Sequence, residues 1–305
     1  MNGMSLSSSA DCPIAVMSFN RPNYLREVLA TLAAQIPTVD PSRVVLFQDG
    51  YRSRSGSDIT DPNLIEQSVK IFSDIFPGST IVESEENIGV ALNFQRAEAF
   101  LFEKKESAIG LFFEDDLILS PHYLEVMQSL IKVALQDKRI AYVAAYGDHL
   151  ASLEQQMQTP TRIVQMRHKW GFALSRRQWL LQKPILEPYL EIISRTDYRS
   201  RDHQAVQEYY RKLGYGSPGT SQDSMKDVAS AVLGTTKIMT YACFGKNIGE
   251  HGLHSFPELY TRAGFDKTQI YPEPVTFFAD PDAATVDRWI EHGRDAARQA
   301  LVPKT

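Results

Sequence analysis

Cysteine is scarce in this sequence. Cys12 and Cys243 are its two cysteines in 305 residues, and no Cys-x-x-Cys pair occurs. An Asn-x-Ser/Thr glycosylation sequon is also missing. Disulfide frameworks and glycosylation sequons are typical of secreted proteins. The sequence therefore predicts a protein of a reducing compartment with unpaired thiols.

Long apolar runs and an excess of basic residues are absent as well. No window reaches the roughly 18 apolar residues of a spanning helix, and the N-terminus lacks the basic and apolar regions of a signal peptide. A formal net charge of −5 and a pI of about 5.8 disfavour a large nonspecific nucleic-acid surface. We expect a cytoplasmic protein without a transmembrane segment, with peripheral membrane attachment as the alternative, and a disordered lead-in at residues 1–12.

What the chain does contain is an alternation of short apolar runs and longer helical patterns. Strands are predicted at 13–19, 43–49, 80–86, 108–113 and 139–147, and helices at 22–35, 61–76 and 89–104. This order predicts an α/β fold with a mostly parallel central sheet covered by helices on both faces. The composition changes near residue 150, so we expect two portions, 13–150 and 151–305, within one globular unit.

Polar residues follow the predicted strands at their carboxyl ends. They are Ser18 to Arg21, Asp49-Gly50, Asn87 to Gly89, and the three consecutive acids Glu114, Asp115 and Asp116. The carboxyl ends of parallel strands meet at one edge of the sheet, where open α/β sheets bind ligands. Each group alone also fits a turn or a helix cap.

The three acids are the most informative of these groups. A helix cap needs one acid, whereas three adjacent carboxylates favour a bound cation. In an extended chain Glu114 and Asp116 would face one side and Asp115 the other. Mn²⁺ and Mg²⁺ prefer oxygen ligands, commonly one or two carboxylates with phosphate oxygens. The motif therefore predicts a divalent metal that carries a diphosphate.

These residues resemble a known family. "FFEDDLILSPHYLEVM", "FNRPNYLREVLATL" and "VVLFQDG" are similar to segments of GT-A glycosyltransferases, above all the inverting N-acetylglucosaminyltransferase family that initiates hybrid and complex N-glycans. The resemblance implies a GT-A-like fold whose first half binds a nucleotide-sugar. It implies these roles: Arg21 near the nucleotide, Asp49 on the uracil, Asp115 on the ribose, Asp116 as direct metal ligand, and Glu114 supporting the metal's waters. Asn87 joins them as a candidate nucleotide-binding residue.

The resemblance continues in the second half in the same order. "KWGFALSRRQW" is similar to the family's Gly-Trp segment, "SQDSMKD" to the segment with the catalytic base, and "FGKNIGEHG" to the loop over the nucleotide. It implies that Trp170 and Gly171 contact the donor or acceptor sugar, that Asp223 is the base, and that His251 lies in the closing loop. Ser221 and Ser224 replace the tryptophans of the family beside the base, and Asn247-Ile248-Gly249 follows a pattern of bacterial transferases.

The resulting prediction is a metal-dependent inverting glycosyltransferase with Mn²⁺ or Mg²⁺. It would move a sugar, GlcNAc or glucose, from a UDP-sugar to a hydroxyl of a glycan, a lipid-linked sugar or another acceptor, with nucleic acid less favoured. From the residues alone, Asp223 also fits the N-cap of the helix that follows it. Asp227 is a second candidate base, with Lys226 or solvent as its expected partner.

Two other functions stay open at this point. One is a sugar-nucleotide nucleotidyltransferase, although "SFNRPNY" lacks the Gly-rich loop expected after the first strand. The other is a non-catalytic module that binds a nucleotide-sugar or glycan. The Arg-rich run at 194–212 is read as a solvated helix face or an acceptor-side surface for an anionic acceptor. A terminal amphipathic helix at 282–301 is expected to dock on the domain, on a second subunit or on a membrane surface.

Overall fold

A computed structural model describes residues 12–252 and 255–301. Within these residues eight strands form one sheet, and two more form a small second sheet. The strands of the large sheet are β1 Ile14–Ser18, β2 Val44–Gln48, β3 Thr80–Glu83, β4 Ile109–Phe113, β6 Ile140–Ala144, β7 Ile163–Gln165, β8 Gly171–Ser175 and β9 Thr236–Thr240. The small sheet pairs β5 Leu117–Leu119 with β10 Gly245–Asn247.

The large sheet is mostly parallel, as predicted. Its order is β3-β2-β1-β4-β8-β6-β9-β7. Strands β3, β2, β1 and β4 are mutually parallel, and β6 is parallel to β9, whereas β8 runs antiparallel to both β4 and β6, and β7 antiparallel to β9. Every residue of β1, β2 and β4 is buried, because helices cover this part of the sheet on both faces.

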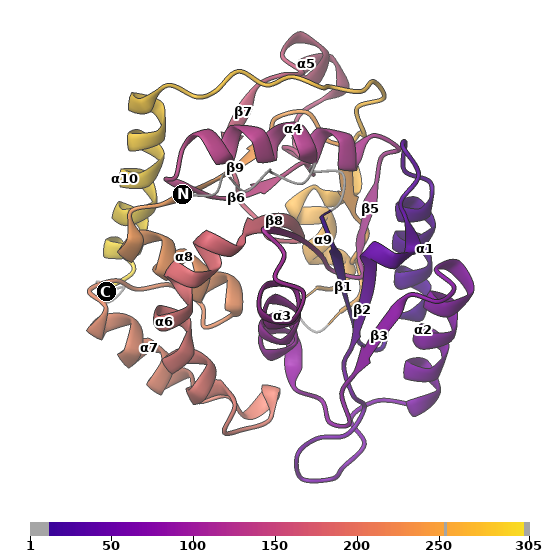
Figure 1. Cartoon of the computed structure of the whole chain (residues 1–305). Coiled ribbons are helices and arrows are strands. Elements are labelled where there is room, and N and C mark those ends of the chain that lie inside the picture. Colours follow the sequence, from indigo (N-terminus) through magenta and orange to yellow (C-terminus); the bar gives the residue numbers. More distant parts are fainter. Residues whose placement is uncertain (1–11, 253–254, 302–305) are drawn as a thin grey trace.

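Helices surround the sheet in two groups (Figure 1). They are α1 Pro22–Ala33, α2 Pro62–Ile75, α3 Gly89–Ala99, α4 Tyr123–Gln136, α5 Leu153–Gln158, α6 Arg176–Ile193, α7 His203–Lys212, α8 Gln222–Leu233, α9 Pro257–Ala263 and α10 Ala283–Gln299. Helices α1 and α2 pack side by side, while α3, α6, α7 and α8 enclose a second apolar cluster that includes Tyr189, Tyr210 and Met225. That second cluster fixes the position of α8, which carries Asp223.

The predicted elements of the first half are found with small shifts at their ends. The helix expected at 89–104 is α3 followed by a π-helical turn at Phe100–Lys104. Strand β8 was not predicted; it comes from beyond residue 150 and pairs with β4 and β6. Both predicted portions therefore contribute strands to the same sheet.

The ends of the chain test two further predictions. Residues 1–11 of the predicted disordered lead-in lie outside the described residues, whereas Cys12 is buried and its carbonyl accepts hydrogen bonds from Arg43. Helix α10 docks on the domain, since Arg294 Nε donates to the carbonyl of Ala231 in α8 over 3.1 Å. Among the described residues, no helix is long and apolar enough to cross a membrane.

Candidate functional site

The acid motif lies where β4 ends, and its neighbour is Arg21. Arg21 directly precedes α1, and its guanidinium pairs with both oxygens of Asp115 and with Asp116 Oδ2, the last over 2.9 Å. The prediction that Asp115 faces away from Asp116 was wrong. Residues 115 and 116 form a turn between β4 and β5 rather than extended chain, so both side chains reach the same arginine.

Negative charge is concentrated at this edge. Burial raises the pKa of Asp116, an effect that Arg21 opposes and Asp115 reinforces. Burial also raises the pKa of Glu114 well above its usual value, and the charges of Asp116 and Asp223 add to this. For Arg21, burial favours loss of the proton, but Asp115 and Asp116 outweigh burial and raise its pKa. The site therefore favours a cation, and Arg21 supplies one.

A loop from the second half of the chain closes over Asp116. Asn247 Nδ2 donates to Asp116 Oδ1 over 3.3 Å, and the backbone N–H of Ile248 donates to the Asp116 carbonyl over 2.8 Å. A Cβ on Gly249 would lie 2.4 Å from Asp116 Oδ2, so glycine is needed for this approach. His251 contributes its backbone, which bonds to Tyr24 and Arg21, while its imidazole is 70% exposed.

Asp49 and Asn87 form a separate, closed arrangement. Asp49 is buried, and its carboxylate accepts four N–H donors, from the backbone of Gly50, Ile88 and Gly89 and from Asn87 Nδ2. Burial raises the pKa of Asp49 to about 6 against the effect of these donors. A carboxylate offers about four acceptor positions, so the hydrogen-bonding capacity of Asp49 is filled within the protein. In this structure Asp49 caps the start of α3.

Asp223 occupies the first turn of α8, two residues after the cap. Ser221 is the N-cap and accepts from the N–H of Ser224 over 3.2 Å, so the alternative that Asp223 caps the helix was wrong. Asp223 Oδ1 is buried and has no hydrogen-bond partner among residues 12–252 and 255–301. The charge of Asp223 contributes to the raised pKa of Glu114, so the two carboxyl groups interact electrostatically.

Asp227 has different partners from those expected. It pairs with Lys169 over 2.6 Å and with Lys237 over 2.5 Å, whereas Lys226 points to the buried Glu98 of α3. Burial would raise the pKa of Asp227, but the two lysines outweigh burial and lower it. The helical turn between residues 226 and 227 directs their side chains to opposite neighbours, which sequence adjacency does not reveal.

Trp170 and Gly171 lie next to Glu114, whose N–H donates to the Trp170 carbonyl over 2.9 Å. The Trp170 ring is half-buried and stacks on His168 with centroids 4.3 Å apart. Burial lowers the pKa of His168 to about 4, so this imidazole is neutral at neutral pH. Gly171 is buried, and a Cβ there would lie 2.6 Å from Leu117 Cδ2, which gives this glycine a packing role.

The structure thus gathers most of the predicted residues. Arg21, the three acids, Asp223, Trp170 and the backbone of His251 converge at one edge of the sheet, and Asp49 with Asn87 forms the neighbouring turn. A scan against protein-family models and a search of curated proteins both find no match. The site itself therefore carries the functional argument.

Sequence reasoning missed several residues of this region. Lys169, Lys237 and Tyr24 each contact the site or its supports, yet Lys237 and Tyr24 stand in ordinary strand and helix patterns and Lys169 lies in the segment between β7 and β8. Asn247 had a usable signal, because its Asn-Ile-Gly repeats the tripeptide at Asn87. Because the first copy of this tripeptide hydrogen-bonds Asp49, the second copy indicates that another aspartate lies beside it, and in the structure this is Asp116.

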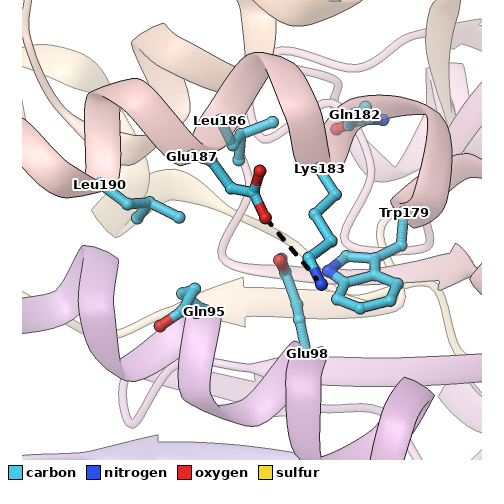
Figure 2. A pocket seen from close by; sticks show the side chains of 8 residues that line it. All are labelled: Gln95, Glu98, Trp179, Gln182, Lys183, Leu186, Glu187 and Leu190. Carbon is cyan, nitrogen blue, oxygen red and sulfur yellow. Dashed lines mark ion pairs between the residues drawn. The ribbon is translucent and has the colours of Figure 1, made fainter.

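A small pocket lies away from this region, between α3 and α6 (Figure 2). Trp179, Lys183 and Glu187 of α6 face Glu98 of α3 across it, and Lys183 pairs with Glu187 over 4.0 Å. None of the predicted site residues lines this pocket.

The acid cluster fits a divalent cation by its chemistry, with Arg21 as the competitor. As the side chains stand, no three His, Cys, Asp or Glu residues within the described part of the chain are arranged to hold a metal. Arg21 takes the Asp116 oxygen that a metal would use. Beside Glu114, the charges of Asp116, Asp223 and Asp115 act against the single guanidinium of Arg21, so the acids outnumber the cation. A hard cation with oxygen ligands matches that excess once Arg21 releases Asp116.

Proposed function

We propose that this protein is a metal-dependent inverting glycosyltransferase with a GT-A-like fold that uses a UDP-sugar donor. One observation carries the proposal. Glu114, one of the three acids at the carboxyl end of β4, has its pKa raised in part by the charge of Asp223 in α8, whose buried Oδ1 has no hydrogen-bond partner among the described residues. The reaction needs carboxylates that bind a metal-diphosphate, and it needs another carboxylate that accepts the proton of the acceptor hydroxyl.

The acid side of the site would bind the donor. Asp116, with Glu114 in support, would hold Mn²⁺ or Mg²⁺, and Asp115 would hydrogen-bond the ribose. When bound, such a cation stabilises the negative charge of a diphosphate leaving group. Arg21 is placed to pass from Asp116 to a phosphate oxygen, since its guanidinium already lies between the acids and the 247–252 loop. Arg21 would then exchange a carboxylate for a phosphate, and Asp116 would exchange the guanidinium for the metal.

The Asp223 side would activate the acceptor. An alcohol is a weak nucleophile at neutral pH, and a carboxylate within hydrogen-bond reach removes its proton as the new bond forms. Asp223 Oδ1 would accept that proton, while the sugar carbon passes through an oxocarbenium-like state and the UDP leaves on the opposite face. A single displacement of this kind inverts the configuration at the anomeric carbon. Trp170 offers an apolar ring beside Glu114 for a sugar.

The test is UDP release in the presence of acceptors. Purified protein is incubated with Mn²⁺ and UDP-GlcNAc or UDP-glucose, with and without a panel of glycan and lipid-linked acceptors. We expect acceptor-dependent UDP release that Asp223→Asn reduces by about a thousandfold, a typical range for loss of a catalytic base combined with its electrostatic effect. Asp202→Asn, on the exposed N-terminus of α7, is the matched control and should release UDP like the wild type.

Two outcomes would contradict the proposal. If UDP binds but no acceptor yields release, and Asp223→Asn leaves binding unchanged, the protein is a non-catalytic module that binds the nucleotide. Arg21 paired with Asp115 and Asp116 is the observation that favours this second function, because it gives two of the three acids a cationic partner within the protein. If no uridine nucleotide binds at all, both functions are wrong.

A further inference from the structure

Two buried lysines lie at α8, Lys169 from outside the helix and Lys226 within it, and they differ in what they touch. Lys169 is 1% exposed and pairs with Asp227 over 2.6 Å; Lys226 is 2% exposed and pairs with Glu98 over 2.5 Å. Burying a charged amine is unfavourable unless it is paired and hydrogen-bonded, and each lysine meets that condition with a carboxylate. Figure 2 shows the Glu98 side chain pointing from α3 toward α6. Lys169 alone of these two also contacts the residue proposed as the base.

That additional contact is a hydrogen bond to the main chain of Asp223. Lys169 Nζ donates to the Asp223 carbonyl over 3.1 Å. Burial would lower the pKa of Lys169, but Asp227 and Asp223 outweigh burial and raise it, so the amine stays charged. Asp227, held in turn by Lys237, keeps Lys169 in place one turn further along the same helix. One cationic group thus bridges two successive turns of α8.

Lys169 is also part of the chain that forms the acid side of the site. It directly precedes Trp170, whose carbonyl accepts the N–H of Glu114 over 2.9 Å. The hydrogen bond to Asp223 therefore connects the segment beside Glu114 to the first turn of α8. Helix α8 has no side-chain hydrogen bond of its own that orients the Asp223 carboxylate, since Oδ1 is without a partner among the described residues. The orientation of Asp223 depends on how its backbone is held.

We propose that Lys169 is the positioning residue for Asp223, and that the Lys169–Asp227–Lys237 cluster fixes the distance between the base and the donor side of the site. The inference rests on the proposed transferase function and gives a role to a residue to which the resemblance assigns none. Reactions of bound groups are sensitive to displacements of about 1 Å, so loss of this tether should slow turnover without weakening the donor.

The test is a double-mutant cycle with Lys169→Met and Asp223→Asn. Methionine keeps most of the volume of lysine, and Asp227 keeps Lys237 as its partner, so no unpaired carboxylate is created. We expect Lys169→Met to lower kcat about 30-fold with an unchanged KM for the UDP-sugar. In the Asp223→Asn background, the same change should lower the residual kcat less than about twofold, because residues that act as a unit are not additive.

The matched control removes the other buried pair. Lys226→Met with Glu98→Gln deletes both charges at once, which avoids a buried unpaired carboxylate. It should lower the melting temperature at least as much as Lys169→Met and change kcat less than about twofold. Asp227→Asn keeps an oxygen acceptor for Lys169 and Lys237 but removes its charge, and it provides a second test if Lys169→Met does not fold. Its expected fivefold loss of kcat should also vanish in the Asp223→Asn background.

The outcomes separate this inference from the function on which it rests. If the wild type transfers sugar, Asp223→Asn lowers transfer to a measurable residual rate, and the fold-loss caused by Lys169→Met or Asp227→Asn is the same in both backgrounds, then Lys169 is structural and the inference is wrong. A rise in the donor KM in place of a fall in kcat would overturn it too. If the wild type releases no UDP, or Asp223→Asn does not reduce release, both the function and the inference are wrong.

Discussion

The tripeptide Asn-Ile-Gly occurs twice in this chain, and the two copies treat their aspartates differently. At Asn87 to Gly89 the turn surrounds Asp49, which accepts two backbone N–H groups of the turn and the Asn87 amide. At Asn247 to Gly249 the turn lies against Asp116, but its backbone N–H at Ile248 bonds to the Asp116 carbonyl and leaves the carboxylate to Asn247 and Arg21. The same three residue types saturate the hydrogen-bonding capacity of the Asp49 carboxylate but leave the Asp116 carboxylate able to pair with Arg21.

Under the proposed function, this difference separates an aspartate that stabilises the fold, Asp49, from one that binds a ligand, Asp116. Asp49 is neutralised by fixed dipoles that move only if α3 moves. Asp116 is neutralised by Arg21, a long side chain that can exchange partners. The comparison assigns stability to the first turn and ligand binding to the second, and substitutions at matched positions should show opposite effects.

The largest expected effect is the loss of activity on removing Asp116. Asp116→Ala should lower UDP-sugar turnover by about a thousandfold, equivalent to about 4 kcal/mol of transition-state stabilisation. Its free energy of unfolding should change by less than about 1 kcal/mol, since the site already has excess negative charge. Steady-state kinetics and urea unfolding measure the two quantities. A variant that loses activity only because it unfolds would contradict the assignment.

The matched change at the first turn should act on stability. Asp49→Ala removes the acceptor of four N–H donors, each of which costs free energy when left buried without a partner. We expect the free energy of unfolding to fall by about 4 kcal/mol. Where the variant remains folded, binding of UDP should weaken far less than in Asp116→Ala. A stable Asp49→Ala protein that is unable to bind UDP would contradict this assignment and would indicate that Asp49 binds the uracil.

The pH dependence of stability provides a third distinction. The folded pKa of Asp49 is raised to about 6, so Asp49 stabilises the fold below its unfolded pKa of about 4 and that contribution disappears as the pH rises through about 6. The loss amounts to at most about 3 kcal/mol. Urea unfolding at pH 4 and pH 7 should show it in the wild type, and Asp49→Asn should remove that part of the difference. An equal pH dependence in both proteins would refute the raised pKa.

The smallest effects should come from the two glycines. Gly89 has φ +79°, and a Cβ there would lie 2.8 Å from the Tyr198 ring, so Gly89→Ala should lower the free energy of unfolding by about 1 to 2 kcal/mol. At Gly249 the added Cβ meets the Asp116 carboxylate instead. Gly249→Ala should weaken metal-dependent UDP binding about tenfold with a smaller stability change. Calorimetry on both variants decides whether the effects separate in this way.

Much of the first half of the fold was predictable, because buried parallel strands are continuous apolar runs and the acids at residues 114–116 directly follow one. The antiparallel insertion of β8 was not, since its pairing with β4 depends on contacts about 60 residues apart that no local pattern records. The position of Asp223 near Glu114 came from the resemblance, and its relation to Lys169 came from the structure. Single lysines in strand patterns carry no signal of the carboxylate they will meet.

The roles of Asp49 and Asp223 show the two ways in which local reasoning fails. Asp49 is followed by glycine at a strand end, a pattern shared by turns and by ligand sites, and only the four donors around it distinguish the two. Asp223 precedes a helical run, as an N-cap does, but in the structure Ser221 is the N-cap and Asp223 lies in the first turn of α8. In both cases the deciding partners lie outside the window that a pattern covers.

The most direct test of the central claim is a thermal-shift titration with UDP, with and without Mn²⁺, on the wild type, Asp116→Ala and Asp49→Asn. A ligand that binds only the folded state adds about 2.7 kcal/mol of stability at a hundredfold excess over its dissociation constant. We predict that UDP with Mn²⁺ stabilises the wild type and Asp49→Asn, that UDP alone does so far less, and that Asp116→Ala shows no metal-dependent shift. An equal shift with and without Mn²⁺ in all three proteins, or no shift in any of them, would contradict a metal-nucleotide site at the three acids.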